Sequence, residues 1–176
     1  MPSGRAALLV AVIADTHGKL DPRVAEAVAR CDVAVHAGDV GAVAVLQALR
    51  PRDGQVLAVR GNNDVAAKWP HGEAEVLESL PWEASWRLPG GELVVVHGDR
   101  AGPARRRHER LRARYPDARA VVYGHSHRLS IDCQQEPWIL NPGAAGRART
   151  YGGPSCLILR AGPRRWRVEP CRFPPP

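Results

Sequence analysis

Paired cysteines, lysines and long apolar runs are scarce in this 176-residue sequence. Its four cysteines are far apart and form no CxxC pair, which argues against a disulfide framework and predicts reduced core thiols in a cytoplasmic protein. The apolar run at residues 6–14 is shorter than the roughly 18 residues that span a membrane. Because this run leads directly into Asp15 and His17, we interpret it as a buried strand and expect neither a signal peptide nor a membrane segment.

Positive charge comes almost entirely from arginine, because Lys19 and Lys68 are the only lysines in a chain of net charge +7. A basic chain favours an anionic partner, such as a small phosphoester substrate or nucleic acid. The stretch from Arg105 to Arg114 holds six arginines, and we interpret it as a solvated helix face, with an anion-binding wall as the alternative. Only Tyr115 offers an aromatic ring beside this stretch, and we expect the five tryptophans to be core and edge anchors, so nucleic acid is the less favoured partner.

Short apolar runs alternate with amphipathic stretches in the first third of the chain. Asp21 is placed to cap a helix whose first residue is Pro22. The β-α-β-α-β pattern implies parallel strands joined by helical crossovers. The predicted strands are residues 6–14, 33–37 and 55–60, and the predicted helices are residues 22–31 and 41–50.

Turn signals and shorter runs dominate the remainder, with no internal repeat and no Ser/Gly linker. We predict one domain over residues 1–173, followed by a proline tail at residues 174–176. Two sheets in a mixed α/β domain are the expected outcome. The predicted elements are a hairpin at residues 83–88 and 92–97, a basic helix at 103–115, a strand at 120–123, and a closing antiparallel run at 138–140, 155–160 and 165–171.

Five short polar motifs each follow a predicted strand. Ligands of α/β sheets bind beyond the carboxyl ends of the strands, so these five loops can converge on one crevice. The motifs are Asp15-Thr16-His17-Gly18, Gly38-Asp39, Gly61-Asn62-Asn63-Asp64, His97-Gly98-Asp99 and Gly124-His125-Ser126-His127.

The motifs supply seven potential metal ligands, all of them oxygen or nitrogen donors. This mixture suits manganese, iron, zinc, nickel or cobalt better than calcium or magnesium. Seven ligands are too many for one ion with an open position, whereas two ions that share a carboxylate would use them all, clamp a phosphate and activate a water. The seven are Asp15, His17, Asp39, Asn62, His97, His125 and His127.

In this order the motifs DxH, GD, GN, H and GHxH resemble the calcineurin-like metallophosphoesterase superfamily, and in particular its small prokaryotic phosphodiesterases with GN[CN]D. The resemblance covers nearly the whole chain. It implies a four-layer α/β/β/α sandwich of two mixed sheets flanked by helices. It also implies two divalent ions, with manganese the first expectation, and a hydroxide between them as the nucleophile. One ion would be held by Asp15, His17, Asp39 and His127, and the other by Asp39, Asn62, His97 and His125, with Asp39 as the bridge.

Two positions depart from the pattern of this family. Asn63 stands where larger members carry a histidine that aids departure of the leaving group. Because an amide is no general acid, this favours diesters or activated leaving groups. Asp99 stands where small relatives often have histidine, and the sequence leaves open whether it faces the site or an arginine.

Other polar residues admit two interpretations. Asp64, grouped here with Asn63 and Asp39 as a catalytic residue, would either orient a ligand histidine or cap the next segment. His36 is expected to be a buried strand histidine and not an eighth ligand, and Asn141-Pro142-Gly143 a tight loop under the site. His71 and His108 are expected in exposed stretches.

The sequence therefore predicts a metal-dependent phosphoesterase that acts on diesters. Two alternatives stay open. Basic charge leaves a nuclease or nucleotide-directed phosphohydrolase, and the resemblance leaves a non-catalytic scaffold, because the family includes a retromer subunit of this kind. The oligomeric state is open, with a homodimer as one option.

Overall fold

The first half of the chain builds one sheet in the computed structural model, which describes residues 6–176, so residues 1–5 of the predicted domain lie outside it. The strand order of this sheet is β10-β9-β1-β2-β3, and β1, β2 and β3 are parallel, as the crossover pattern predicted. Asp21 caps α1 by accepting a hydrogen bond from the Arg23 N–H at 2.9 Å, and Pro22 begins the helix. The elements are β1 (Leu8–Ile13), α1 (Pro22–Ala29), β2 (Val33–His36), α2 (Val43–Ala48) and β3 (Gln55–Ala58).

The second half builds the other sheet and then closes the first. The strand order here is β4-β5-β6-β8-β7, with the predicted hairpin formed by antiparallel β4 and β5. The chain then returns through β9, which pairs antiparallel to β1. The elements are α3 (Ala74–Ser79), β4 (Glu83–Leu88), β5 (Gly91–Val96), α4 (Ala104–Arg114), β6 (Ala120–Val122), β7 (Ser130–Asp132), β8 (Trp138–Asn141), β9 (Ser155–Ala161) and β10 (Trp166–Arg172).

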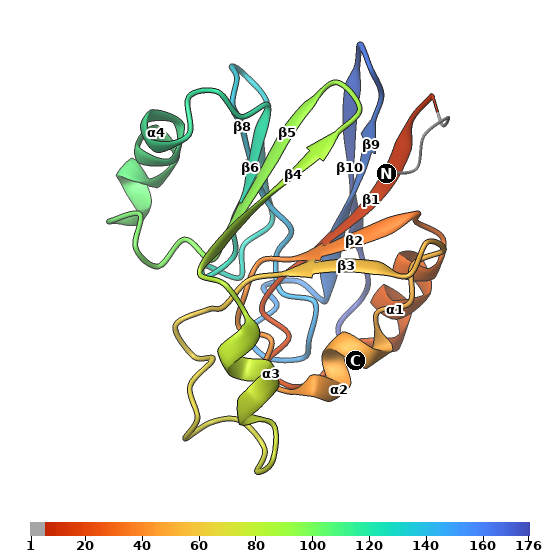
Figure 1. Cartoon of the computed structure of the whole chain (residues 1–176), viewed down its shortest axis with the longest axis vertical. Coiled ribbons are helices and arrows are strands. Elements are labelled where there is room, and N and C mark those ends of the chain that lie inside the picture. Colours follow the sequence, from red (N-terminus) through yellow and green to blue (C-terminus); the bar gives the residue numbers. More distant parts are fainter. Residues whose placement is uncertain (1–5) are drawn as a thin grey trace.

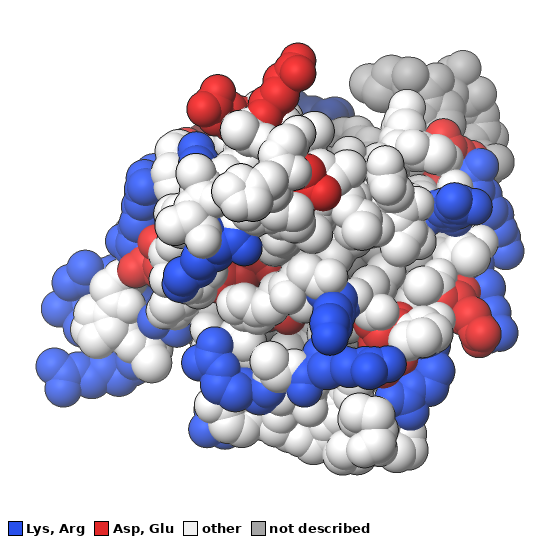
Figure 2. Space-filling view, turned by 90° about the horizontal axis from the view of Figure 1, so that it is seen from below, with Lys and Arg blue, Asp and Glu red and all other residues white. Residues whose placement is uncertain are grey.

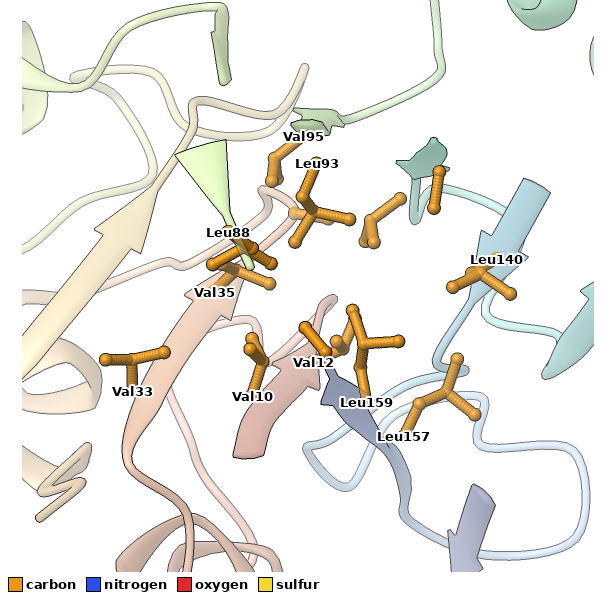
Figure 3. Packing of buried hydrophobic residues seen from close by; sticks show 14 of the residues in the cluster. Val10, Val12, Val33, Val35, Leu88, Leu93, Val95, Leu140, Leu157 and Leu159 are labelled. Atoms are coloured by element: carbon orange, nitrogen blue, oxygen red, sulfur yellow. The ribbon is translucent and has the colours of Figure 1, made fainter. Parts of the chain in front are cut away.

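Alternating side chains of the strands divide the apolar residues among three layers. Val10 and Val12 point toward the opposite sheet, where they meet residues such as Leu93 in the core between the two sheets (Figure 3). Ala11 and Ile13 point the other way and pack under α1. On the far side of the second sheet, a further apolar cluster packs Leu111 of α4 against β5, β6 and β8. The predicted four-layer α/β/β/α sandwich is confirmed (Figure 1).

Two short elements were not predicted from the sequence. α3 has six residues and β7 has three, so neither offers enough periodicity to be distinguished from a loop. Among the tryptophans, Trp69 and Trp166 are core residues as expected, but Trp82 has 42% of its surface exposed. None of the helices within residues 6–176 combines the length and the apolar character that a membrane crossing requires.

The charged side chains are spread unevenly over the surface. Seen from the end of the molecule that carries α3, this face shows basic side chains at both edges and across its lower middle, while acidic side chains protrude at the top and right and lie recessed near the centre (Figure 2). The four cysteines are free thiols, although Cys156 and Cys171 lie directly opposite each other on β9 and β10.

Candidate metal centre

The loops at the strand ends turn sharply at the predicted ligands. In residues 6–176, seven non-glycine residues have positive φ, and five of them are predicted ligands. Residues other than glycine rarely adopt a backbone conformation with positive φ, which costs about 1–3 kcal/mol per residue. Such strain is typical of functional sites. The five are Asp15 (φ 55°), His17 (48°), Asp39 (54°), His125 (69°) and His127 (59°).

The first group of ligand atoms comes from Asp15, His17 and His127. One donor atom from each lies within 4.8 Å of the others. The Nε2 atoms of the two histidines face each other at 3.1 Å, and His127 Nε2 is 3.6 Å from Asp15 Oδ1. His127 Nδ1 is 3.1 Å from the Ala148 carbonyl, to which it can donate, so its Nε2 lone pair is available for a cation.

The second group comes from Asp15, Asp39 and His97, again within 4.8 Å. His97 Nε2 lies 3.4 Å from Asp39 Oδ2 and 3.0 Å from Asn62 Oδ1, while Nδ1 faces the Ala37 carbonyl at 2.8 Å. The ring of His125 lies edge-on to that of His97, with 5.3 Å between centroids. Asp39 touches both groups, because its Oδ2 is also 3.6 Å from His17 Nε2.

Burial sets the charges in the centre. It raises the pKa of Asp15 to about 7, and it lowers the pKa values of His17, His125 and His127, which keeps their lone pairs free near neutral pH. For the Asp39–His97 pair, burial is opposed by their hydrogen bond and opposite charges. The interaction prevails, so the pKa of His97 rises to about 9 and that of Asp39 falls below its usual range.

Asp15 gives the clearest indication that this centre suits a cation. It is fully buried, and its Oδ2 has no hydrogen-bond partner among the described residues. A buried carboxylate oxygen without a partner is costly, and a cation would satisfy it. The donor set of carboxylates, imidazoles and an amide therefore fits divalent transition metals, and the structure brings together the side chains that the sequence predicted to bind them.

Asp64 is fully buried behind these side chains, and within residues 6–176 it forms no hydrogen bond with a ligand histidine. Its Oδ1 accepts hydrogen bonds from the Gly41 N–H and the Trp69 Nε1–H, and its Oδ2 from the N–H groups of Val40 and Gly61. It thereby ties the loop after β2 to the loop after β3. Close approach is needed here, because a Cβ on Gly61 would lie 2.2 Å from Asp39 Oδ1.

The other polar residues are accounted for by local bonds. His36 is fully buried, its Nδ1 accepts from the Gly38 N–H, and its Nε2 bonds Thr16 Oγ1, so it is a satisfied strand histidine as expected. Buried Asn141 donates to the Gly124 carbonyl and to Ser126 Oγ, which supports the GHSH loop from beneath. His71 is exposed.

The expectation that His108 would be exposed is wrong. It is half-buried, with Nδ1 2.9 Å from Asp132 Oδ2 and Nε2 2.8 Å from the Tyr123 hydroxyl. The acidic partner comes from β7, a strand that the sequence did not reveal, so the contact could not be foreseen.

Asn63 uses both ends of its amide within the site. Its Nδ2 donates to Asp39 Oδ2 at 2.8 Å, its backbone N–H donates to Asp39 Oδ1 at 2.9 Å, and its Oδ1 accepts from Lys68 Nζ. Lys68 and Arg149 line a hollow of about 250 Å³ together with His17 and Asp39. The guanidinium Nη2 of Arg149 is 3.5 Å from His127 Nε2.

These two cations were not predicted as site residues. Arg149 comes from an irregular loop after β8, and Lys68 follows the motif by four residues, so no spacing marked either. The scarcity of lysine was the one available signal for Lys68. Burial lowers the pKa of His125, and the nearby Asp99 carboxylate partly opposes this shift; Asp99 also lines a larger cavity together with His97.

Comparison with solved structures supports the fold. The chain is similar to vacuolar protein sorting 29 from Cryptosporidium parvum, with 19% identity, a TM-score of 0.70, and 97% of this chain and 100% of that chain covered. It is also similar to an archaeal phosphodiesterase (18%, TM-score 0.66, 93% and 100% covered) and to a predicted phosphoesterase from Streptococcus pneumoniae TIGR4 (21%, TM-score 0.64, 96% and 91% covered).

No curated protein sequence matches the chain. A family model, however, matches most of it. The model describes the calcineurin-like phosphoesterase superfamily domain and covers residues 8–162, a span that holds all five motifs and all seven predicted ligands. The family predicted from the order of the motifs is thereby confirmed, and this chain belongs to the calcineurin-like phosphoesterase superfamily.

Proposed function

We propose that this protein is a metal-dependent phosphodiesterase. The observation that carries the proposal is the convergence of the two ligand groups, which share Asp15 and adjoin at Asp39, beside a hollow lined by Lys68 and Arg149. A pair of divalent ions in this position would polarise the phosphoryl oxygens and lower the pKa of a water. Manganese is our first choice, with iron, zinc, nickel and cobalt as alternatives.

Different residues of the chain would bind the two ions and the phosphoryl group. Asp39 would bridge the ions and is held by two N–H groups of Asn63. Asp15, His17 and His127 would complete one ion site, and Asn62, His97 and His125 the other. Lys68 and Arg149 lie on the rim of the hollow, where their charges would bind the non-bridging oxygens of the phosphoryl group.

The preference for diesters rests on what surrounds Asn63. Its amide is bonded to Asp39 and Lys68, and it offers no acidic proton to a leaving group. We propose that such a site acts on esters whose leaving group needs no strong acid. Asp64 would contribute by fixing the two loops that carry Asp39 and Asn62.

Hydrolysis of bis(p-nitrophenyl) phosphate tests this proposal. We expect turnover in Mn²⁺ that EDTA abolishes, and a loss of at least about a hundredfold in Asp39→Asn, because the substitution removes the shared negative charge. Asp117→Ala, an exposed turn residue, is the matched control and should keep full activity. Absence of metal-dependent turnover of any phosphoester by the folded protein would rule the function out.

A scaffold function is the second candidate. It is supported by the fold shared with vacuolar protein sorting 29. If the protein is a scaffold, removal of the ions should leave its binding to partner proteins unchanged. Weak metal binding by the purified chain would also favour the scaffold function.

A further inference from the structure

A second and larger cavity lies between the start of β4 and α4. Its volume is about 550 Å³, which is in the range that holds small organic ligands. His97, Gly98 and Asp99 form part of its wall, so the loop after β5 is shared between this cavity and the metal centre. The two sites are therefore adjacent in the molecule.

The cavity carries more positive than negative charge, because three arginines and two carboxylates, those of Glu83 and Asp99, line it. Arg114 is paired with Glu83 at 2.9 Å, and the same carboxylate accepts from the Tyr115 hydroxyl at 2.5 Å. Arg100 and Arg110 also line the cavity, and within residues 6–176 neither forms an ion pair with a carboxylate. Two guanidinium groups are thus available to an anionic ligand.

The cavity also presents an exposed aromatic ring. Within residues 6–176, Trp82 is the only exposed tryptophan, with 42% of its surface accessible, and it lines the cavity. The Arg100 guanidinium carbon is 4.1 Å from the centre of the indole, and that of Arg60 is 4.9 Å away. These guanidinium groups already lie over the indole, so a planar group would stack on the part of the ring that stays accessible, beside the two cations.

We propose that this cavity binds a planar aromatic group that carries its own negative charge, as in a nucleotide. The ring would pack against Trp82 and Tyr115, and the anionic group would bind Arg100 and Arg110. As a recognition site for one ester group of the substrate, this rests on the proposed phosphodiesterase function, whereas the binding itself does not require the metals. This proposal also gives a role to part of the arginine-rich stretch, because Arg110 and Arg114 line the cavity.

Calorimetric titration of adenosine monophosphate into the metal-free protein tests the proposal. We expect saturable binding with one molecule per chain, weakened at least about tenfold in Trp82→Ala and in Arg110→Met. Arg106→Met is the matched control, because Arg106 lies on the same helix and pairs with Glu109 at the surface. It should bind as the wild type does. Trp82→Phe retains a ring and should preserve most of the binding, which guards against misfolding of the alanine variant.

Two results would overturn the proposal. One is an affinity that neither Trp82→Ala nor Arg110→Met changes. The other is full displacement by inorganic phosphate at equal concentration, which would place the ligand elsewhere. A lack of diester hydrolysis is a separate result, because it would contradict the proposed function but not the binding of a nucleotide in this cavity. Binding that depends on Trp82 and Arg110 supports the cavity proposal even without diester hydrolysis, and hydrolysis without nucleotide binding contradicts it.

Discussion

The environment of Asp15 favours the binding of a cation. Its carboxylate is fully buried, one oxygen has no partner among the described residues, and its pKa is raised by burial to about 7. Burying an ionised carboxylate oxygen without a partner costs several kcal/mol, and a bound cation would offset that cost. Three nearby histidines are held neutral, which completes a set of donors.

The pKa values predict how metal affinity depends on pH. Bound metal requires Asp15 ionised and His97 neutral, yet in the metal-free protein the pKa of Asp15 is about 7 and that of His97 about 9. Both protons must leave, so affinity should rise as pH increases from 6 to 9, and binding at pH 7 should release protons. Calorimetry in buffers of different ionisation enthalpy measures this release. An affinity that is flat or falls over this range would contradict the prediction.

The cations beside the ligands lead to a second residue-scale prediction. Lys68→Met and Arg149→Met should each lower kcat/KM for a diester roughly tenfold to a hundredfold, because each removes a charge that would bind a phosphoryl oxygen. Lys19→Met, which removes the only other lysine, is the control and should have little effect. Equal losses in all three variants would show that overall charge matters and that position does not.

At the scale of elements, loops joined by Asp64 hold the site together. Its carboxylate accepts four N–H groups, from the loops after β2 and β3 and from Trp69. These bonds fix the separation between Asp39 and Asn62. The sequence left two roles open for Asp64, the orientation of a ligand histidine and the capping of the next segment, and the observed bonds join the loops after β2 and β3.

Asp64→Ala is therefore expected to destabilise the fold. It leaves up to four donors without an acceptor, at about 1–3 kcal/mol for each buried one, so the free energy of unfolding should fall by at least about 3 kcal/mol. Urea denaturation of the metal-free protein measures this. Asp117→Ala should stay within about 0.5 kcal/mol of wild type, and a similar value for Asp64→Ala would refute the assigned role.

The helices and strands that could be predicted from the sequence are those with a clear apolar periodicity and a motif at their end. Strands such as β1 and β2 are buried apolar runs that a polar motif follows. The sequence therefore predicted both the position of these strands and the end at which the metal ligands lie. α3 and β7 are too short for such a signal. The pairing of His108 with Asp132 depends on β7, and therefore could not be anticipated.

At the scale of the whole molecule, the two sheets bring together loops distant in the sequence. His17 and His127 are 110 residues apart, yet their Nε2 atoms lie 3.1 Å from each other. The position of each motif directly after a strand predicted this convergence, and in the structure the carboxyl ends of β1, β2 and β3 in one sheet meet those of β5 and β6 in the other. Contacts made only by packing, such as those of Lys68, Arg149 and the exposed Trp82, have no local signature and emerged from the structure alone.

We propose that these loops form one centre for two metal ions. Equilibrium dialysis of the purified chain against Mn²⁺, followed by elemental analysis, tests it most directly when wild type is compared with Asp39→Asn. We predict two ions per chain in wild type and the loss of at least one in the variant, since Asp39 adjoins both ligand groups. Fewer than one ion per wild-type chain, or the same count in both proteins, would contradict the account.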